Sequence, residues 1–277
     1  MVSPVDLHIH STFSDGLLTP AEIVEKAISL SMKLIAISDH DSVTGISKAN
    51  NVANGKIGVV PAIEFNTEVG KENVHILGYG FDIKNQFLND IIADRQADRV
   101  ERAKKMVDRL HDIGIKNISY DDIFKLAENG AVGRPHVAKA LFLSGNVKSL
   151  GYAFEKYLAV GRPAYIARAT FTPIQAIHTI HAAGGIAVLA HPGKIGDPIR
   201  ILNILLNEGL NGIEVYHTDH SKSVTEKMFQ RAKSAGLFMT VGSDSHGPMI
   251  RNVEIGSVYA PDAVIESIFS CFYSFLM

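Results

Sequence analysis

The feature that most constrains the fold of this 277-residue chain is a recurring order of short apolar runs, each followed by a helical pattern. The runs are VDLHIH, KLIAISDHD, IAVLAHPG, GIEVYHTDH and LFMTVGSDSHG. Thr19, Pro20 and Glu22 follow the first run as an N-cap, a first-turn proline and a capping-box carboxylate. Strands that alternate with helices predict a parallel sheet, and their number predicts a closed or nearly closed barrel. A doubly wound open sheet is the alternative.

The middle of the chain differs in character. IGVVPAIEFNTE and NVHILGYG predict two strands with a turn at Gly70 and Asn73, and DIIADRQADRVERAKKMVDRLHDIG then predicts a long amphipathic helix ending at Gly114. Helical patterns continue without a convincing strand. We therefore expect an α/β barrel in two parts, residues 1–86 and 168–277, separated by a helical insertion at 87–167.

The long helix carries charges of both signs in alternation, which predicts a solvent-exposed face. They are Arg95, Arg99, Arg102 and Lys105, interleaved with Asp94, Asp98 and Glu101.

Composition excludes several classes of protein. A net charge of -2 and a pI near 6.6 give no global positive field for nucleic acid or a membrane surface. Cys271 is the only cysteine, which excludes an intramolecular disulfide and a thiolate-rich metal site. The first residues lack the pattern of a signal peptide, and no apolar run is long enough for a membrane helix. We therefore expect a cytoplasmic protein without a membrane anchor.

Potential metal ligands follow nearly every predicted strand. His8 and His10 are two residues apart, so in a strand both imidazoles project to the same side. Each residue taken singly is more typical of a cap, a turn or a hydrogen-bonded core histidine. Independent caps have no reason to gather at one end of a barrel, however, and unpaired carboxylates would resist burial together. The candidate ligands are His8, His10, Asp15, His40, Glu64, His75, His191, Asp244 and His246.

Imidazole and carboxylate without thiolate suit Mn, Zn or Fe(II), and to a lesser degree Mg. Nine ligands exceed the needs of one ion, so two or three divalent ions with shared carboxylates are expected. Such ions lower the pKa of a water molecule and neutralise phosphate oxygens, which is most of what phosphate-ester hydrolysis needs. The predicted catalytic residues are His8, His10, Asp15, Glu64, Asp244 and His246.

Six motifs in order resemble the PHP (polymerase and histidinol phosphatase) domain family: DLHIHSTFSDG, ISDHDSVTG, VPAIEFNTE, VHILGYGF, AVLAHPG and GSDSHG. The resemblance implies a distorted seven-stranded, TIM-like β/α barrel with a trinuclear metal site. By this resemblance three groups of ligands are expected: His8, His10, Glu64 and Asp244 for one ion; Asp15, His40 and His246 for a second; and His75 and His191, with Glu64 bridging, for a third.

The insertion also resembles one branch of that family. AVGRPHVAKAL and YLAVGRPAYI are similar to the branch of nucleoside 3′,5′-bisphosphate phosphatase, AMP phosphatase and the 5′-to-3′ exoribonuclease. In that branch the insertion caps the metals, which implies that Arg134 and His136 meet substrate phosphate. His217 follows a strand and is expected to line the pocket, whereas His178 and His181 lie mid-helix, where packing or surface roles are expected.

The resulting hypothesis is a metal-dependent phosphoesterase that uses a metal-bridging hydroxide on a small phosphorylated substrate. Its substrates would be 3′,5′-bisphosphate nucleotides, AMP or short 5′-phosphorylated oligoribonucleotides. A histidinol-phosphate phosphatase would use the same metal face. A non-catalytic, metal-stabilised module for a polymerase or another partner is a third possibility, and a metal-dependent amidohydrolase is a remote fourth. No membrane and no obligate protein partner are expected.

Overall fold

Seven strands form one sheet in the part of the chain that the computed structural model describes, namely residues 2–70, 72–127, 130–247 and 253–276. Their spatial order follows the sequence. They are β1 (Val5–Ile9), β2 (Leu34–Ile37), β3 (Gly58–Val69), β4 (Glu72–Tyr79), β5 (Ile186–Leu189), β6 (Gly212–His217) and β7 (Phe238–Gly242). The chain after β7 returns to β1, where Asp244 N–H donates to His8 O at 2.8 Å and His10 N–H donates to Ser245 O at 3.0 Å. The sheet is therefore a nearly closed barrel, and the open-sheet alternative is wrong.

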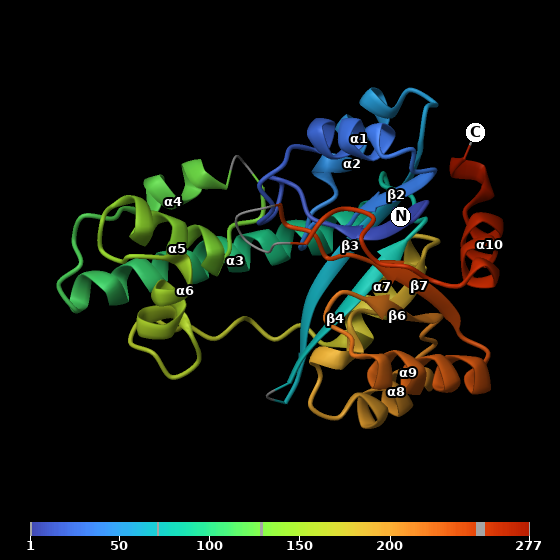
Figure 1. The fold of residues 1–277 in the computed structure, drawn as a ribbon. Helices are drawn as coiled ribbons and strands as arrows, with labels where there is room; N and C mark the ends of the chain where they lie inside the picture. The colour runs from blue at the N-terminus through green and yellow to red at the C-terminus, as the bar shows by residue number, and fades with distance from the viewer. Residues whose placement is uncertain (1, 71, 128–129, 248–252, 277) are drawn as a thin grey trace.

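One strand departs from the predicted parallel order. β4 runs antiparallel to both β3 and β5, whereas the other neighbouring strands pair in parallel. The cause is local, because Gly70 adopts a φ of +63° and the chain turns directly from β3 into β4 without a crossover helix. The prediction of a parallel sheet was thus wrong for this strand, whereas the predicted turn at Gly70 joins β3 and β4 into a long hairpin (Figure 1).

Helices cover the outside of the barrel (Figure 1). The N-cap of the first helix forms as the sequence predicts, since Thr19 Oγ1 accepts from Glu22 N–H at 3.3 Å and Glu22 in turn accepts from Thr19 N–H at 2.8 Å. The helices of the barrel are α1 (Pro20–Ser29), α2 (Thr44–Ala53), α7 (Pro173–Ala182), α8 (Pro198–Leu206), α9 (Lys222–Ala235) and α10 (Asp262–Cys271), with 3₁₀ turns η2 (Pro192–Lys194) and η3 (Tyr273–Phe275).

The segment between β4 and α7 is helical and projects to one side of the barrel (Figure 1). Its elements are α3 (Gln86–Asp112), α4 (Tyr120–Leu126), α5 (Arg134–Leu143), α6 (Leu150–Ala153) and the π-turn η1 (Phe154–Leu158). The first turns of α3 pack Leu88 and Ile92 into the core of the barrel, whereas Met106 and Leu110 belong to a separate apolar cluster of the helical segment. α3 thus joins the barrel to the helical segment. The boundaries at 87 and 167 remain our proposal for the domain division.

None of the helices in the described residues is long and apolar enough to cross a membrane.

Candidate metal centre

Four side chains meet at the mouth of the barrel in a geometry that suits one metal ion. They are His8 of β1, His10 directly after β1, Glu64 of β3 and Asp244, which follows β7. Five distances among His8 Nε2, His10 Nε2, Glu64 Oε2 and Asp244 Oδ1 lie between 3.1 and 3.5 Å. Tetrahedral coordination with bonds of about 2.1 Å would place neighbouring ligand atoms about 3.4 Å apart. These four atoms therefore have the spacing of a coordination shell.

The other five predicted ligands surround this group. His246 Nε2 lies 3.3 Å from Asp15 Oδ1, and His40 Nε2 lies 3.9 Å from Asp15 Oδ2. On the opposite side of Glu64, His75 Nδ1 and His191 Nε2 lie 2.8 and 2.9 Å from Oε1. Ligand atoms of His10, Asp15, His40 and His246 all lie within 4.8 Å of one another, as do those of His40, Glu64 and His75. The structure thus brings all nine predicted residues together.

Two of these residues, His75 and His40, differ from the predicted position after a strand or from the ligand group that the resemblance implies. His75 lies within β4 rather than after a strand, and it reaches the mouth because β4 runs in the opposite direction to its parallel neighbours. His40 stands between two groups, since its Nδ1 lies 2.9 Å from Glu64 Oε2 while its Nε2 faces Asp15. A single imidazole therefore links the second group to Glu64, which the resemblance shares between the first and third groups.

The carboxylates of the cluster are buried and charged. Burial by itself raises the pKa of a carboxyl group, yet the surrounding histidines hold the pKa of Asp15, Glu64 and Asp244 well below its usual value. The first histidines responsible are His246 for Asp15, His40 for Glu64 and His8 for Asp244. Asp15 Oδ1 and Glu64 Oε2 are buried without a hydrogen-bond partner. Buried anionic oxygens that lack hydrogen-bond donors are suitable ligands for divalent cations.

Further residues contact the predicted ligands on the sides that face away from the ligand cluster. Lys194 Nζ lies 2.8 Å from Asp244 Oδ2, on the side of that carboxylate away from His10. His217 Nδ1 accepts from Asp219 N–H at 3.0 Å, so in the neutral ring the proton sits on Nε2, 3.5 Å from Asp244 Oδ2. His217, expected to line the pocket, is instead fully buried behind Asp244.

Glu214 is a further member of this set, and like Lys194 it was not predicted from the sequence. Glu214 of β6 is fully buried and contacts His8. Despite burial, the neighbouring His8 and His217 lower the pKa of Glu214 to about 2. The available signal was a lone acid between Ile213 and Val215 in an apolar strand, since a charged residue is almost never fully buried unless it is paired.

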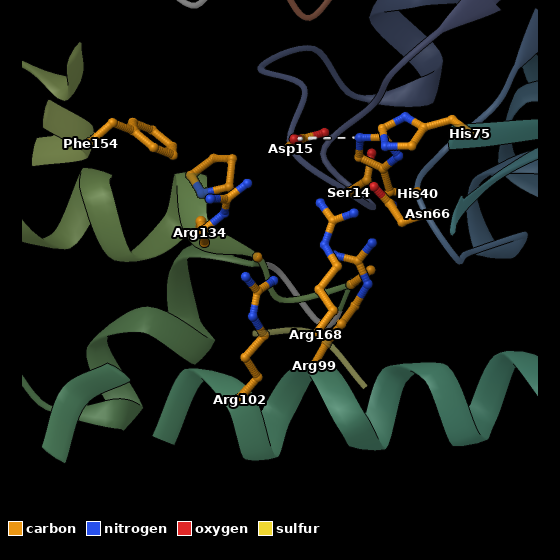
Figure 2. Close-up of a pocket in the computed structure, with 13 residues that line it drawn as sticks. Ser14, Asp15, His40, Asn66, His75, Arg99, Arg102, Arg134, Phe154 and Arg168 are labelled. Atoms are coloured by element: carbon orange, nitrogen blue, oxygen red, sulfur yellow. Dashed lines mark ion pairs between the residues drawn. The ribbon is translucent and has the colours of Figure 1, made fainter. Parts of the chain in front are cut away.

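A cavity of about 220 Å³ opens beside the cluster (Figure 2). Ser14, Asp15, His40, Asn66 and His75 line its barrel side. The facing wall comes from the helical insertion and the segment after it, and its labelled side chains are Arg99, Arg102, Arg134, Phe154 and Arg168 (Figure 2). The cavity therefore lies between the candidate ligands and a group of four arginines, which we call the arginine wall: Arg99, Arg102, Arg134 and Arg168.

The arginine wall corrects the prediction that the charged face of α3 is exposed to solvent. Arg99 and Arg102 rise from α3 toward the cavity (Figure 2), whereas Glu101 and Lys105 of the same helix are exposed as predicted. Arg102 Nε donates to Ile166 O at 2.8 Å because the segment that returns to the barrel crosses this face of the helix. The alternating charges could not show which turns of the helix that segment covers.

The arginine wall carries crowded positive charge. Burial, followed by the nearby Arg168 and Arg134, lowers the pKa of Arg102 to about 9. Burial, followed by Arg99 and Arg134, lowers the pKa of Arg168 to about 10, and Arg168 Nη1 is buried without a hydrogen-bond partner. Both groups remain cationic at neutral pH. Such a wall favours an anionic ligand, because guanidinium groups bind phosphate through paired hydrogen bonds.

The two insertion residues predicted to meet phosphate differ in placement. Arg134 lines the cavity, with its guanidinium 5.9 Å from the ring centres of both Phe154 and Tyr165. His136 does not line the cavity, because Nδ1 accepts from Gly133 N–H at 3.0 Å and the ring also forms a backbone hydrogen bond with Ser14. Burial lowers the pKa of His136 to about 4. His136 thus ties α5 to the loop that carries Asp15.

Comparisons with known proteins agree with the fold. A family model described as the PHP domain matches residues 6–142. The chain is 36% identical over 255 residues to the 5′-3′ exoribonuclease of Haemophilus influenzae, covering 90% of this chain and 92% of the relative. The chain belongs to the PHP family. The predicted family and the predicted distorted barrel are therefore confirmed.

Two further relatives of this PHP protein cover nearly its whole length. The 3′,5′-nucleoside bisphosphate phosphatase of Chromobacterium violaceum is 34% identical over 250 residues, which span 88% of this chain and 87% of the relative. A crystal structure from Bifidobacterium adolescentis, described as a metal-dependent phosphoesterase, superposes with a TM-score of 0.86 at 29% identity and covers 96% of this chain and 95% of the other. The helical insertion is thus shared by these relatives and is not peculiar to this chain.

Proposed function

We propose that this PHP protein hydrolyses phosphate esters of nucleotides or short oligonucleotides with the help of divalent metal ions. One observation carries the proposal: nine candidate ligands converge on buried, unpartnered carboxylate oxygens directly beside a cavity with an arginine wall. The names of the curated relatives support the same enzyme class, a hydrolase acting on phosphate esters. Two classes of anion-binding group, metal ions and guanidinium groups, thus face one small cavity.

The nine side chains suit two to three ions, each chosen from Mn, Zn, Fe or Mg. When bound, the ions would lower the pKa of a water molecule and neutralise the phosphate oxygens. His8, His10, Glu64 and Asp244 would hold the first ion, and the remaining ligands would divide between the other positions, with His40 and Glu64 shared. The distances support this division: the first four atoms have tetrahedral spacing, and the longer Asp15 to His40 separation leaves room for a larger shell.

The arginine wall would bind a second anionic group of the substrate. Arg168 Nη1 is buried and has no hydrogen-bond partner, so a phosphate oxygen would satisfy it. Arg102 and Arg134 contribute further positive charge across the same cavity. A substrate with two phosphate groups therefore fits both ends of the cavity. Histidinol phosphate carries a cationic amine away from its phosphate, and that amine would face arginine instead. We accordingly propose residues 87–167 as a substrate cap.

The direct test is a substrate panel with purified protein and Mn²⁺. The substrates are adenosine 3′,5′-bisphosphate, AMP, a 5′-phosphorylated RNA oligomer and histidinol phosphate, and the readout is released phosphate or nucleotide. We expect nucleotide substrates to be hydrolysed faster than histidinol phosphate. Absence of hydrolysis with all three nucleotide substrates would overturn the proposal. Unchanged activity of the His10→Ala variant, combined with a lower melting temperature, would instead favour a non-catalytic module.

A further inference from the structure

Glu214 is a buried carboxylate that the proposed reaction does not use directly. It lies in β6, is fully inaccessible to solvent, and does not line the cavity. Both of its oxygens are nevertheless engaged: Oε1 lies 2.9 Å from His8 Nδ1, and Oε2 accepts from the backbone N–H of His191 at 2.7 Å. A single side chain therefore contacts two candidate ligand residues that are 183 positions apart in the sequence.

The contact with His8 fixes the state of that imidazole. An ionised carboxylate only accepts hydrogen bonds, so Nδ1 of His8 must carry the proton that points to Glu214. In the neutral ring the lone pair then lies on Nε2, and Nε2 is the atom that faces His10, Glu64 and Asp244. This arrangement of carboxylate, histidine and ligand-binding nitrogen is the one by which proteins orient metal-binding imidazoles.

The contact with His191 fixes a backbone position. His191 has a φ of +26°, a value uncommon for a residue with a side chain, at the point where β5 ends and η2 begins. Its N–H is held by Glu214 Oε2, while its Nε2 lies 2.9 Å from Glu64 Oε1. The unusual backbone turn and the direction of the imidazole thus depend on the same carboxylate.

The neighbouring strand leaves room for this arrangement. Gly242 of β7 lies against both partners, and a Cβ atom at that position would fall 2.3 Å from His8 Cβ and 2.4 Å from Glu214 Oε1. Contacts so short would displace His8 or Glu214. The hydrogen bond between Glu214 and His8 therefore requires glycine in β7 at position 242.

We propose that Glu214 is a positioning residue that joins two separate parts of the metal centre, His8 in the first group and His191 in the third. The inference rests on the ligand assignment made under the proposed function. Without the Glu214 charge, the Nδ1–H group of His8 and the backbone N–H of His191 would both lose the acceptor that holds them in place. Metal ions at both positions would then bind less tightly, although Glu214 itself contacts neither the substrate nor the cavity.

Glu214→Gln tests the proposal, since it keeps the size of the side chain and removes the charge. Metal-free protein is titrated with Mn²⁺ and with Zn²⁺ against a competing chelator, and bound metal is counted by elemental analysis. We expect the affinity to fall by about 10- to 100-fold, the range for partners of metal-bound histidines. Hydrolysis should recover when excess Mn²⁺ is supplied, because the ligands themselves remain.

Asp6→Asn is the matched control. Asp6 is a carboxylate of β1 that is equally buried, but it accepts from the backbone N–H groups of His8, Ser243 and Gly256 and from the side chain of Ser243, rather than from an imidazole. Both variants should unfold at lower temperature in chelator, whereas only Glu214→Gln should lose metal affinity. If Glu214→Gln does not fold, Glu214→Asp, which keeps the charge but shortens its reach, is expected to show the same loss.

Three outcomes distinguish failure of this inference from failure of the proposed function. If the wild-type protein binds metal but Glu214→Gln binds it with equal affinity, or loses no more than Asp6→Asn, the inference is overturned and the proposed function stands. If the wild-type protein binds no divalent metal, the ligand assignment fails and the inference fails with it. Because metal binding is measured without substrate, a wild-type protein that binds metal but hydrolyses nothing overturns only the proposed function.

Discussion

Arg99 of the helical insertion binds Asp41 of the barrel, with Nε and Nη2 lying 2.7 and 2.5 Å from the same carboxylate oxygen. Asp41 directly follows the candidate ligand His40, and its N–H donates to Glu64 O at 3.0 Å. Asp41 Oδ1 also accepts from Asn66 N–H at 3.3 Å. The ion pair therefore connects α3 to the segment after β2 that carries His40 and to β3, which carries Glu64.

Arg99→Ala should destabilise the protein and weaken metal binding. The substitution leaves Asp41 buried without its cation, which costs about 2 to 3 kcal/mol for a pair that is mostly shielded from solvent. Urea denaturation of metal-free protein measures this change. Lys105→Ala is the control, because Lys105 lies on the same helix but is exposed, and it should alter stability by no more than about 0.5 kcal/mol. Equal losses in the free energy of unfolding for the two variants would show that the ion pair stabilises the protein no more than an exposed lysine does.

Arg168→Ala should discriminate between substrates with one and two phosphates. Removing a hydrogen bond to a charged group costs about 1.5 to 3 kcal/mol, so kcat/KM for adenosine 3′,5′-bisphosphate should fall by about 10- to 100-fold. The value for adenosine 3′-phosphate, which lacks the second phosphate, should change little. The measurement is a comparison of both substrates with both proteins, and the same loss on both would contradict a separate anion site at the arginine wall.

The stability of the protein should depend on pH through His136. Burial lowers the pKa of His136 to about 4, below the value near 6.5 expected in the unfolded chain. The unfolded state therefore takes up the proton first, and stability is lost as the pH falls from about 6.5 to about 4. The loss amounts to about 3 kcal/mol at most. Denaturation of metal-free protein at pH 7 and pH 5 should show a smaller pH effect in His136→Gln, and an unchanged difference would refute this assignment.

Metal binding should release protons. Burial lowers the pKa of His10, but Asp244 and Glu64 outweigh this effect and raise it to about 10, so the metal-free ring is charged at neutral pH. A ring that binds metal must lose that proton. Titration of Mn²⁺ into metal-free protein should therefore release protons in calorimetry with buffers of different ionisation enthalpy, and affinity should increase with pH. Binding without proton release would contradict the position of His10 in the centre.

The sequence predicted the ligands better than it predicted their surroundings. His8 and His10 could be placed on one side of a strand because strand geometry has a fixed period of two. The predicted turn at Gly70 indicated that β4 reverses direction after β3, but the apolar pattern could not show that β4 then pairs with β5, so it did not reveal how His75 reaches the mouth.

The missed residues share a physical cause. Arg99 and Arg102 lie on a helix whose charges alternate, and the segment around Ile166 that covers them comes from far along the chain. Glu214 is one acid in an apolar strand, and its partners His8 and His191 are brought to it only by closure of the barrel. Local periodicity predicts which face of an element is polar, but it does not predict what that face contacts.

The most direct test of this account is a crystal structure of the protein grown with Mn²⁺, with the ions located by their anomalous scattering. We expect ions bound by His8, His10, Glu64 and Asp244 and by the neighbouring groups around His40 and His191. Hydrolysis of nucleotide phosphates by a protein whose crystals show no anomalous peak at this mouth of the barrel would contradict this expectation.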